Sequence, residues 1–289
     1  ANRGPWMVLE KAGVKLVEVK LLQNGGLDYE DFKSKINEKT VMVCMGMSSN
    51  ALGTLNDFHS VRSFLPNNCL FLLDAVHYAP HFAINVSELG CDFLLCSAYK
   101  FYGPHVGFLY SRPGLLDSLD TDRLVVQDQS APFIIETGTL NHAACAGVSA
   151  AIEFIASLGE GDSLRSKLVD AYSKISVHEF ALAKYLHDSL CVLDKVNVVG
   201  QDFSNTKRTP TVSFVHSDYT PNEICKKLAS SNICAWDGHF YALKAIQQLG
   251  LEKKGGVTRL GISIYNTKEE VERVVSVSYT HLRAHETAY

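Results

Sequence analysis

The segment from Asp92 to Gly107, with the sequence DFLLCSAYKFYGPHVG, decides the fold prediction. Its start, residues 92–96, is an apolar run typical of a strand buried on both faces. Lys100 follows this run, between hydroxyl-bearing side chains and the turn at Gly103-Pro104. Lysine is usually a solvated surface residue, and this setting is unusual for one. We therefore expect Lys100 to belong to a functional site.

Asp74 ends a second apolar run, CLFLL at residues 69–73, and lies 26 residues before Lys100. An amine at one strand end and a carboxylate at another suit pyridoxal 5′-phosphate (PLP), because the amine condenses with the aldehyde and the carboxylate keeps the pyridine nitrogen protonated. In open α/β sheets, ligands bind beyond the carboxyl ends of the strands. Asn50, Asp74 and Lys100 each follow such an end, so we expect them to share one pocket.

Strand-like and helical segments alternate along the chain, which predicts an α/β fold with a mostly parallel sheet. Strands are expected at 15–20, 40–45, 69–73, 92–96, 106–110, 211–215, 232–236 and 257–262. Helices are expected at 28–36, 56–64, 143–158 and 163–190, and after the capping boxes that begin at Thr220 and Thr267. We predict a large domain at residues 1–158 and a smaller α/β domain at 159–276.

Bulk composition excludes several classes of protein. The chain has 289 residues, 46% hydrophobic content and a formal net charge of −4, which fit a folded core and give no sign of a nucleic-acid or membrane partner. No apolar run approaches the roughly 20 residues that cross a bilayer. The eight cysteines form no C-x-x-C pair, so we expect buried, reduced thiols and a cytoplasmic location. His77 and His81 have helical metal spacing, but Pro80 intervenes and we predict no metal.

Both ends of the chain are unusual. It begins at Ala1 without an initiator Met, as if it were cut from a longer protein. Residues 277–289, VSYTHLRAHETAY, resemble the translation of a sequencing adapter. We therefore expect an N-terminal truncation and a non-native C-terminal tail, and the tail contributes nothing to the functional prediction.

Five motifs carry a resemblance to a known family. They are Ser49-Asn50-Ala51-Leu52-Gly53-Thr54, Asp74-Ala75-Val76-His77, Ser97-Ala98-Tyr99-Lys100 with Gly103-Pro104, Glu136-Thr137-Gly138-Thr139, and Arg259 before Tyr265-Asn266-Thr267. With them, the chain resembles the class V aminotransferases, in particular their cysteine desulfurase-like branch, over nearly all of residues 1–276. The resemblance implies the fold type I of PLP-dependent enzymes and a homodimer with its sites at the interface.

The resemblance also implies roles around the cofactor ring. Lys100 would form the internal aldimine and later move protons at the substrate α-carbon. Asp74 would pair with the pyridinium nitrogen, because a neighbouring carboxylate favours the charged ring. His77 would lie near the phenolic oxygen of the ring, and Asn50 would reach the same oxygen.

Further roles concern the phosphate and the substrate. Ser97 would hold the phosphate, together with Tyr99, where desulfurases often carry His. Thr139 would reach the phosphate of the cofactor in the partner subunit. Arg259 would bind the substrate carboxylate through its planar guanidinium. Arg259 lies in an apolar strand, where an unpaired guanidinium is costly, so a ligand or a buried partner is expected for it.

Two departures from the family pattern bear on function. Tyr241 occupies the position of the persulfide-forming cysteine of desulfurases, and Cys234 lies seven residues earlier, within a predicted strand. Only a thiolate accepts sulfur in this chemistry. The cofactor-stacking His and the glycine-threonine phosphate loop of the family would precede Ala1.

We therefore predict a PLP-dependent transferase or lyase that acts on a small amino acid. Removal of the α-proton would be followed by β-elimination or by cleavage of a C–S or C–Se bond. Persulfide transfer is the less favoured reaction because of Tyr241. The alternative is a non-catalytic or inactive fold type I relative, while an NAD-dependent dehydrogenase would need a G-x-G-x-x-G motif, which the chain lacks.

Overall fold

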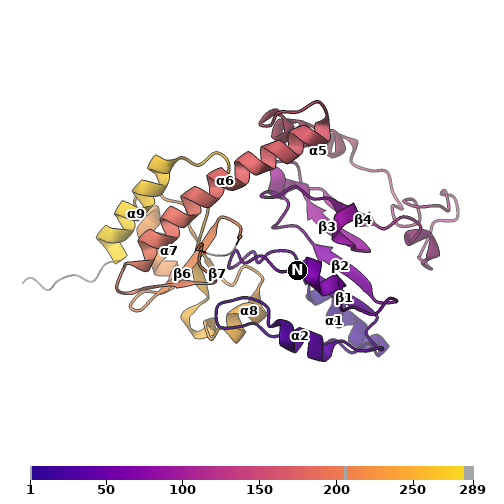
Figure 1. The fold of residues 1–289 in the computed structure, drawn as a ribbon, viewed down its shortest axis with the longest axis horizontal. Helices are drawn as coiled ribbons and strands as arrows, with labels where there is room; N and C mark the ends of the chain where they lie inside the picture. Colours follow the sequence, from indigo (N-terminus) through magenta and orange to yellow (C-terminus); the bar gives the residue numbers. More distant parts are fainter. Residues whose placement is uncertain (1, 205–206, 283–289) are drawn as a thin grey trace, which may run out of the picture. The chain divides into compact units, whose positions relative to one another are not determined.

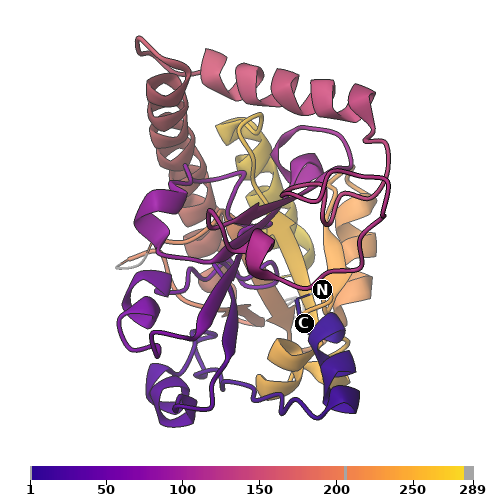
Figure 2. The same ribbon diagram turned by 90° about the vertical axis from the view of Figure 1, so that its right-hand side faces the viewer.

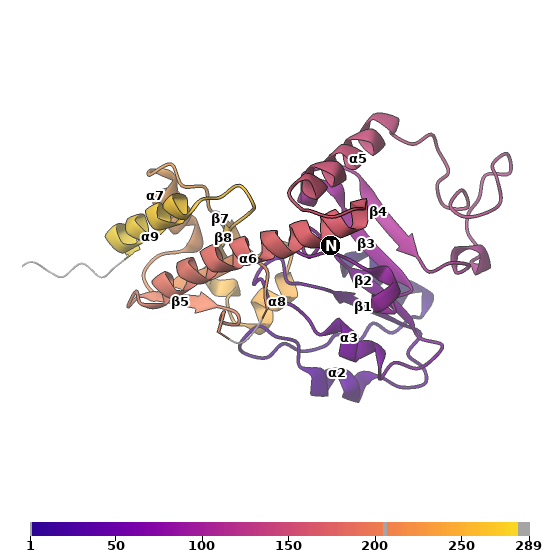
Figure 3. The same ribbon diagram turned by 45° about the horizontal axis from the view of Figure 1, so that its top comes forward.

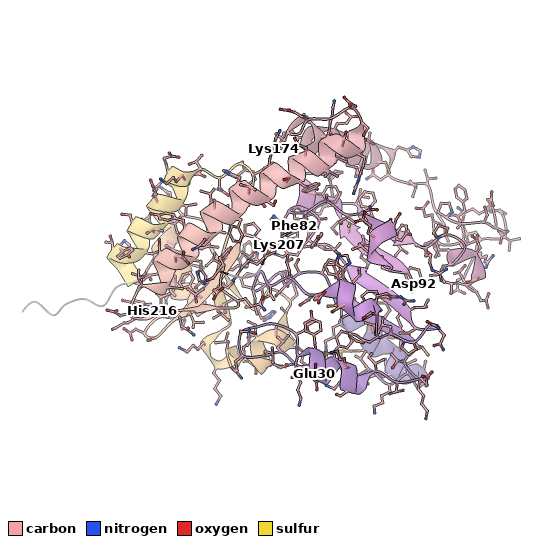
Figure 4. The ribbon with its side chains drawn as sticks, in the orientation of Figure 1. Glu30, Phe82, Asp92, Lys174, Lys207 and His216 are labelled. Atoms are coloured by element: carbon pink, nitrogen blue, oxygen red, sulfur yellow. The ribbon has the colours of Figure 1, made fainter. Side chains whose placement is uncertain are left out.

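The computed structural model describes residues 2–204 and 207–282 (Figure 1). Contacts divide the chain into two compact units, each with a sheet of its own. The antiparallel-sheet unit takes in the described parts of Ala1–Lys35, Ser48–Asn56 and Ile175–Tyr289, and the mixed-sheet unit takes in Ile36–Met47 and Asp57–Lys174. The division falls inside helix α6, Leu164–Cys191, after Lys174, which Figure 4 labels.

The mixed sheet has four strands, which lie side by side in Figure 3. They are β1 (Met42–Gly46), β2 (Leu70–Asp74), β3 (Phe93–Ser97) and β4 (Gly107–Ser111), in the order β1-β2-β3-β4. β1, β2 and β3 are parallel, and β4 returns antiparallel to β3. Phe71 and Leu73 of β2 are fully buried, as the unbroken apolar run predicts for a central strand.

Short capped helices connect the parallel strands. Asp57 caps α3 (Phe58–Arg62) by accepting the backbone N–H of Ser60, and Asn85 caps α4 (Val86–Leu89) in the same way through Ser87. A longer helix of this unit, α5 (His142–Ser157), begins after Asn141, whose side chain accepts the N–H of Ala144. The caps of α3 and α5 are local sequence signals, and these two helices begin within about two residues of the predicted helices 56–64 and 143–158.

The second sheet is antiparallel throughout. Its strands are β5 (Val196–Val199), β6 (Thr211–His216), β7 (Trp236–Gly238) and β8 (Val257–Gly261), in the order β5-β6-β8-β7. Helices α7 (Pro221–Ala229) and α9 (Lys268–Leu282) pack against each other (Figures 1 and 2). Phe214, Ile224 and Leu228 are fully buried in the core of this unit.

The remaining helices are short. They are α1 (Gly4–Met7), α2 (Tyr29–Lys35) and α8 (Leu243–Gln248), with 3₁₀ turns η1 (Val8–Ala12), η2 (Ala98–Phe101), η3 (Leu116–Ser118) and η4 (Glu252–Lys254). Over the described residues, no helix combines the length and the apolar character that crossing a bilayer requires.

The α/β prediction is confirmed, and four details differ from expectation. Residues 15–20 form no strand; the chain makes a single bridge just beyond them, between Leu21 and Leu27. The strand expected at 232–236 begins only at Trp236, and β5 is a strand that the sequence did not predict. Three of the eight thiols, those of Cys145, Cys191 and Cys234, are exposed instead of buried.

The tail and the domain limits stay predictions. Residues 277–282 continue helix α9, where Ser278 and Leu282 are buried and the Leu282 carbonyl accepts from His216 Nε2 at 2.9 Å. His216, the last residue of β6, is labelled in Figure 4. Residues 283–289 lie outside the described part of the chain. Contacts group the chain differently from the predicted limits 1–158 and 159–276, because 1–35 and 48–56 associate with the C-terminal sheet.

Candidate active site

Asp74 is the last residue of β2 and lies next to Leu95 of the parallel strand β3. Its carboxylate is partly buried, and Oδ1 accepts the backbone N–H of Val76 at 3.0 Å. Burial raises the pKa of Asp74, and the hydrogen bond from Val76 opposes that shift. A carboxylate held in this setting has a strong electrostatic preference for a cationic partner.

Lys100 lies in η2, the 3₁₀ turn that begins directly after the last residue of β3. The turn is fixed by Tyr102, which has a left-handed backbone with φ of 70°, and by the N–H of Gly103, which donates to the carbonyl of Ala98 at 2.9 Å. A β-carbon at residue 103 would meet Cβ of Ala98 at 3.0 Å, so the tight approach favours glycine. Lys100 is partly buried, and its amine lies 5.0 Å from the centre of the Tyr99 ring.

Asp74 and Lys100 are therefore carried by the carboxyl ends of two neighbouring parallel strands. The pairing of β2 with β3 places both ends at one edge of the mixed sheet. Ser97, the last residue of β3, lies at the same edge and is partly buried. This edge is where an open α/β sheet binds its ligand.

The predicted site residues His77, Tyr99 and Thr139 also lie in the mixed-sheet unit. The His77 ring meets the ring of His81 edge to face, with centroids 5.6 Å apart. Tyr99 is 46% exposed, and its ring stacks on His105 at 5.0 Å with an interplanar angle of 5°. Thr139 is exposed, in the segment that precedes α5. His105 was missed from the sequence, because five residues separate it from Tyr99 and no periodic pattern joins them.

Asn50 and Arg259 belong to the antiparallel-sheet unit, where they contact each other. Nη1 of Arg259, in the middle of β8, donates to the carbonyl of Asn50 at 2.7 Å. The guanidinium lies over the ring of Phe240, 4.0 Å from its centre. Nδ2 of Asn50 donates to the carbonyl of Phe240 at 2.7 Å. The buried partner expected for Arg259 is therefore present, and it is a carbonyl together with an aromatic face.

Burial also affects the ionisation of the Arg259 guanidinium. It lowers the pKa of the Arg259 guanidinium below its ordinary value, because the charged form loses hydration. The group keeps its charge at neutral pH and can receive a carboxylate. Phe240 was missed in the sequence, because its contact with Arg259 forms only in the folded chain.

The loop that carries Tyr241 has an unusual backbone. Phe240 and Tyr241 both have left-handed backbones, with φ of 51° and 61°, and Tyr241 is 87% exposed. The N–H of Tyr241 donates to Nδ1 of His239 at 3.1 Å. Cys234, predicted to lie within a strand, precedes β7 instead and is exposed. The buried side chain of this segment is that of the neighbouring Ile233.

Comparison with known proteins identifies the family. The sequence profile described as aminotransferase class-V matches residues 1–274. The chain belongs to the class V aminotransferase family.

Individual relatives agree with this assignment. A probable cysteine desulfurase of Halalkalibacterium halodurans is 30% identical over 94% of this chain and 66% of the relative. An aminotransferase-like protein of Gibberella zeae is 29% identical over 95% of this chain and 68% of the relative. The solved apo structure of a cysteine desulfurase from Thermococcus onnurineus superposes with a TM-score of 0.82 at 26% identity, covering 96% of this chain and 69% of that one. The chain thus spans about two thirds of the length of these two curated relatives.

Proposed function

We propose that the protein is a PLP-dependent enzyme that acts on a small, cysteine-like amino acid. The observation that carries this proposal is the pair of Asp74 and Lys100 at the carboxyl ends of adjacent parallel strands. Family membership and the printed names of the relatives support it.

The side chains of the mixed-sheet unit fit the chemistry of this cofactor. The partly buried carboxylate of Asp74 has lost part of its hydration, so a protonated ring nitrogen would stabilise its charged form. Lys100 offers the primary amine for covalent attachment, and Ser97 and Tyr99 offer hydroxyl groups beside it for a phosphate. When bound, the cofactor supplies an electrophilic aldehyde and a ring that withdraws electrons from the substrate α-carbon.

The remaining roles fall to other side chains of the chain. Arg259 binds and orients the substrate carboxylate, and Phe240 supports the guanidinium from below. Lys100 is the base that moves the proton at the α-carbon. By the family pattern, His77 and Asn50 would hold the phenolic oxygen of the cofactor, and Thr139 would hold the phosphate of the cofactor in the partner subunit. These assignments follow from the family pattern.

We further propose a homodimer and a cytoplasmic location. The dimer is supported by the exposed apolar side chains of β4, Phe108 and Leu109, on an edge strand of the mixed sheet. The location is supported by the eight cysteines, all of which are free thiols.

The test of the proposed function is the visible absorbance of the protein after addition of PLP. The wild-type protein should show a band that small amino acids shift, and Lys100→Ala should abolish the band. Lys39→Ala, at an exposed lysine of the same unit, is the matched control and should retain it. A band that persists in Lys100→Ala would rule out attachment at Lys100. A band that no amino acid shifts would favour the non-catalytic alternative.

A further inference from the structure

The loop that carries Asn50, Ser48–Asn56, is fastened to the antiparallel sheet through four consecutive carbonyl groups. Each carbonyl from Asn50 to Gly53 accepts a hydrogen bond from a residue on or beside β6 or β8. The donors, in order, are Arg259 Nη1 to Asn50, Ser213 Oγ to Ala51, Arg208 Nη2 to Leu52 and the Thr209 backbone N–H to Gly53. We call this set the carbonyl clasp.

Arg208 is the buried centre of the clasp. It is only 2% exposed, and its Nη2 donates to the carbonyls of Leu52 at 2.6 Å and Thr211 at 2.7 Å. The guanidinium also lies 4.3 Å from the ring centre of Phe203. Burial lowers its pKa to about 10, so it still carries its charge at neutral pH. A charged donor forms stronger hydrogen bonds to these carbonyls than a neutral one would.

The backbone of the loop is shaped to fit this donor. Gly53 has φ of +76°, and a β-carbon there would meet the carbonyl oxygen of Thr211 at 2.7 Å and Nη2 of Arg208 at 3.0 Å. Within the loop, the N–H of Gly53 donates to the carbonyl of Ser49 at 2.9 Å, and the N–H of Leu52 donates to Oγ of Ser49 at 3.1 Å. The loop and the strand therefore approach closely and with defined geometry.

The clasp connects two groups that the proposed function uses. Arg259 donates to the Asn50 carbonyl, while the Asn50 side chain donates to the Phe240 carbonyl beneath the same guanidinium. Movement of the loop would therefore shift both the Asn50 amide and the support of Arg259. Arg208 and Ser213 fix the two carbonyls that follow Asn50, and Ser213 also lies opposite Arg259 in the pairing of β6 with β8.

We infer that Arg208 and Ser213 are positioning residues, which hold the Asn50 loop so that Arg259 keeps the orientation needed to receive a substrate carboxylate. This inference rests on the proposed function. It predicts that loss of the clasp weakens recognition of the carboxylate specifically, and loosens the loop without unfolding the unit.

Two variants of the PLP-loaded protein test it, Arg208→Lys and Ser213→Ala. We expect the concentration of amino acid that half-saturates the change in cofactor absorbance to rise about tenfold for Arg208→Lys and about threefold for Ser213→Ala. As a second ligand we take the amine that differs from the amino acid only in lacking the carboxylate. Both variants should bind this amine with the same affinity as the wild type. Hydrogen exchange followed by mass spectrometry should become faster in peptides covering residues 48–56 and stay unchanged in peptides covering β2 and β3.

Arg273→Lys is the matched control. Arg273 also donates to a backbone carbonyl, that of Ser231 at 2.6 Å, but it is exposed and lies outside the clasp. It should change neither readout. Equal weakening for the amino acid and the amine in both clasp variants would overturn the inference, because it would show a purely structural role. Unchanged exchange in residues 48–56 of both variants would also overturn it.

The exchange readout also separates the two proposals. If the wild-type protein forms no cofactor band, the proposed function fails, and the positioning role in carboxylate recognition fails with it. Faster exchange in the clasp variants would then still establish the clasp as the support of the loop.

Discussion

Asp74 is a carboxylate at the end of an apolar strand, and its environment disfavours its charge. Burial raises its pKa, while the single backbone hydrogen bond from Val76 opposes this only in part. A group whose folded pKa is raised contributes stability below its ordinary pKa of 3.8, and that contribution is lost as the pH rises through the folded value. In the cofactor-free protein, Asp74 therefore weakens the fold at neutral pH.

We predict that Asp74→Asn stabilises the cofactor-free protein at pH 7 and abolishes binding of PLP. The amide oxygen can still accept from Val76, so the variant removes the charge and little else. The gain in the free energy of unfolding, measured by urea titration, should shrink toward zero as the pH falls below about 4.

Asp92→Asn is the control for this prediction and should have the opposite effect. The Asp92 carboxylate accepts from the Phe71 N–H at 2.8 Å and from Nε of Arg112 at 2.7 Å, so its charge has partners (Figure 4 labels Asp92). A gain in stability for Asp74→Asn that persists unchanged in acid would contradict the assigned cause.

Some residues of the candidate site could be predicted from the sequence and others could not. Lys100 and Asp74 could be found because each interrupts an apolar run, and charge at a strand end is unusual. Arg259 could be found because it lies inside an apolar strand, where an unpaired guanidinium is costly. His105 and Phe240 could not, because their roles arise from contacts with Tyr99 and Arg259 that only the folded chain creates. Whether Asn50 shares a pocket with Asp74 and Lys100, as the sequence predicts, stays a prediction.

Among the elements, those with local signals were predicted well. Each of these signals lies within one short stretch of sequence. Examples are the apolar runs of β1, β2 and β3 and the capping box of α7. The order β5-β6-β8-β7 depends on pairing between distant segments, and β5 has only four residues. The sequence predicted only a smaller α/β domain there, and its strands pair antiparallel.

The capping box of α7 makes a prediction about stability. Oγ1 of Thr220 accepts the N–H of Glu223 at 3.3 Å, and the Glu223 carboxylate accepts the N–H of Thr220 at 2.8 Å. Thr220→Ala should lower the free energy of unfolding by about 1 kcal/mol, since an unsatisfied first turn is left. Thr220→Ser retains the acceptor and should lie within about 0.5 kcal/mol of the wild type in the same urea titration. A loss as large for Ser as for Ala would show that the methyl group matters more than the cap.

The loop around Tyr241 bears on whether the protein can release sulfide from cysteine. Tyr241 cannot act as the sulfur-accepting nucleophile, and Cys234 is an exposed thiol seven residues away. We expect that Cys234 is not the sulfur acceptor. If the protein releases sulfide from cysteine in the presence of a thiol reductant, Cys234→Ser should therefore change the rate of sulfide release by no more than about twofold. Cys145→Ser, at another exposed thiol, is the control. A large loss confined to Cys234→Ser would identify it as the acceptor.

At the scale of the whole molecule, the mixed-sheet unit exposes several large apolar side chains. Phe108 and Leu109 of the edge strand β4 are 38% and 43% exposed, and Val125 and Val126 are almost fully exposed. An edge strand with large apolar side chains invites pairing or association. This supports the proposed homodimer, in which Thr139 would reach the cofactor of the partner subunit.

Leu109→Glu tests this proposal, because a carboxylate placed in an apolar interface loses its hydration. Sedimentation velocity should show a dimer for the wild type and a monomer for the variant at the same concentration. Val177→Glu, at a 70% exposed position on α6, is the control and should remain dimeric. The monomeric variant should also bind PLP at least about tenfold more weakly, since Thr139 could then no longer act across the interface. A monomeric variant that binds PLP as tightly as the wild type would show that cofactor binding does not depend on the dimer. It would also contradict the role assigned to Thr139.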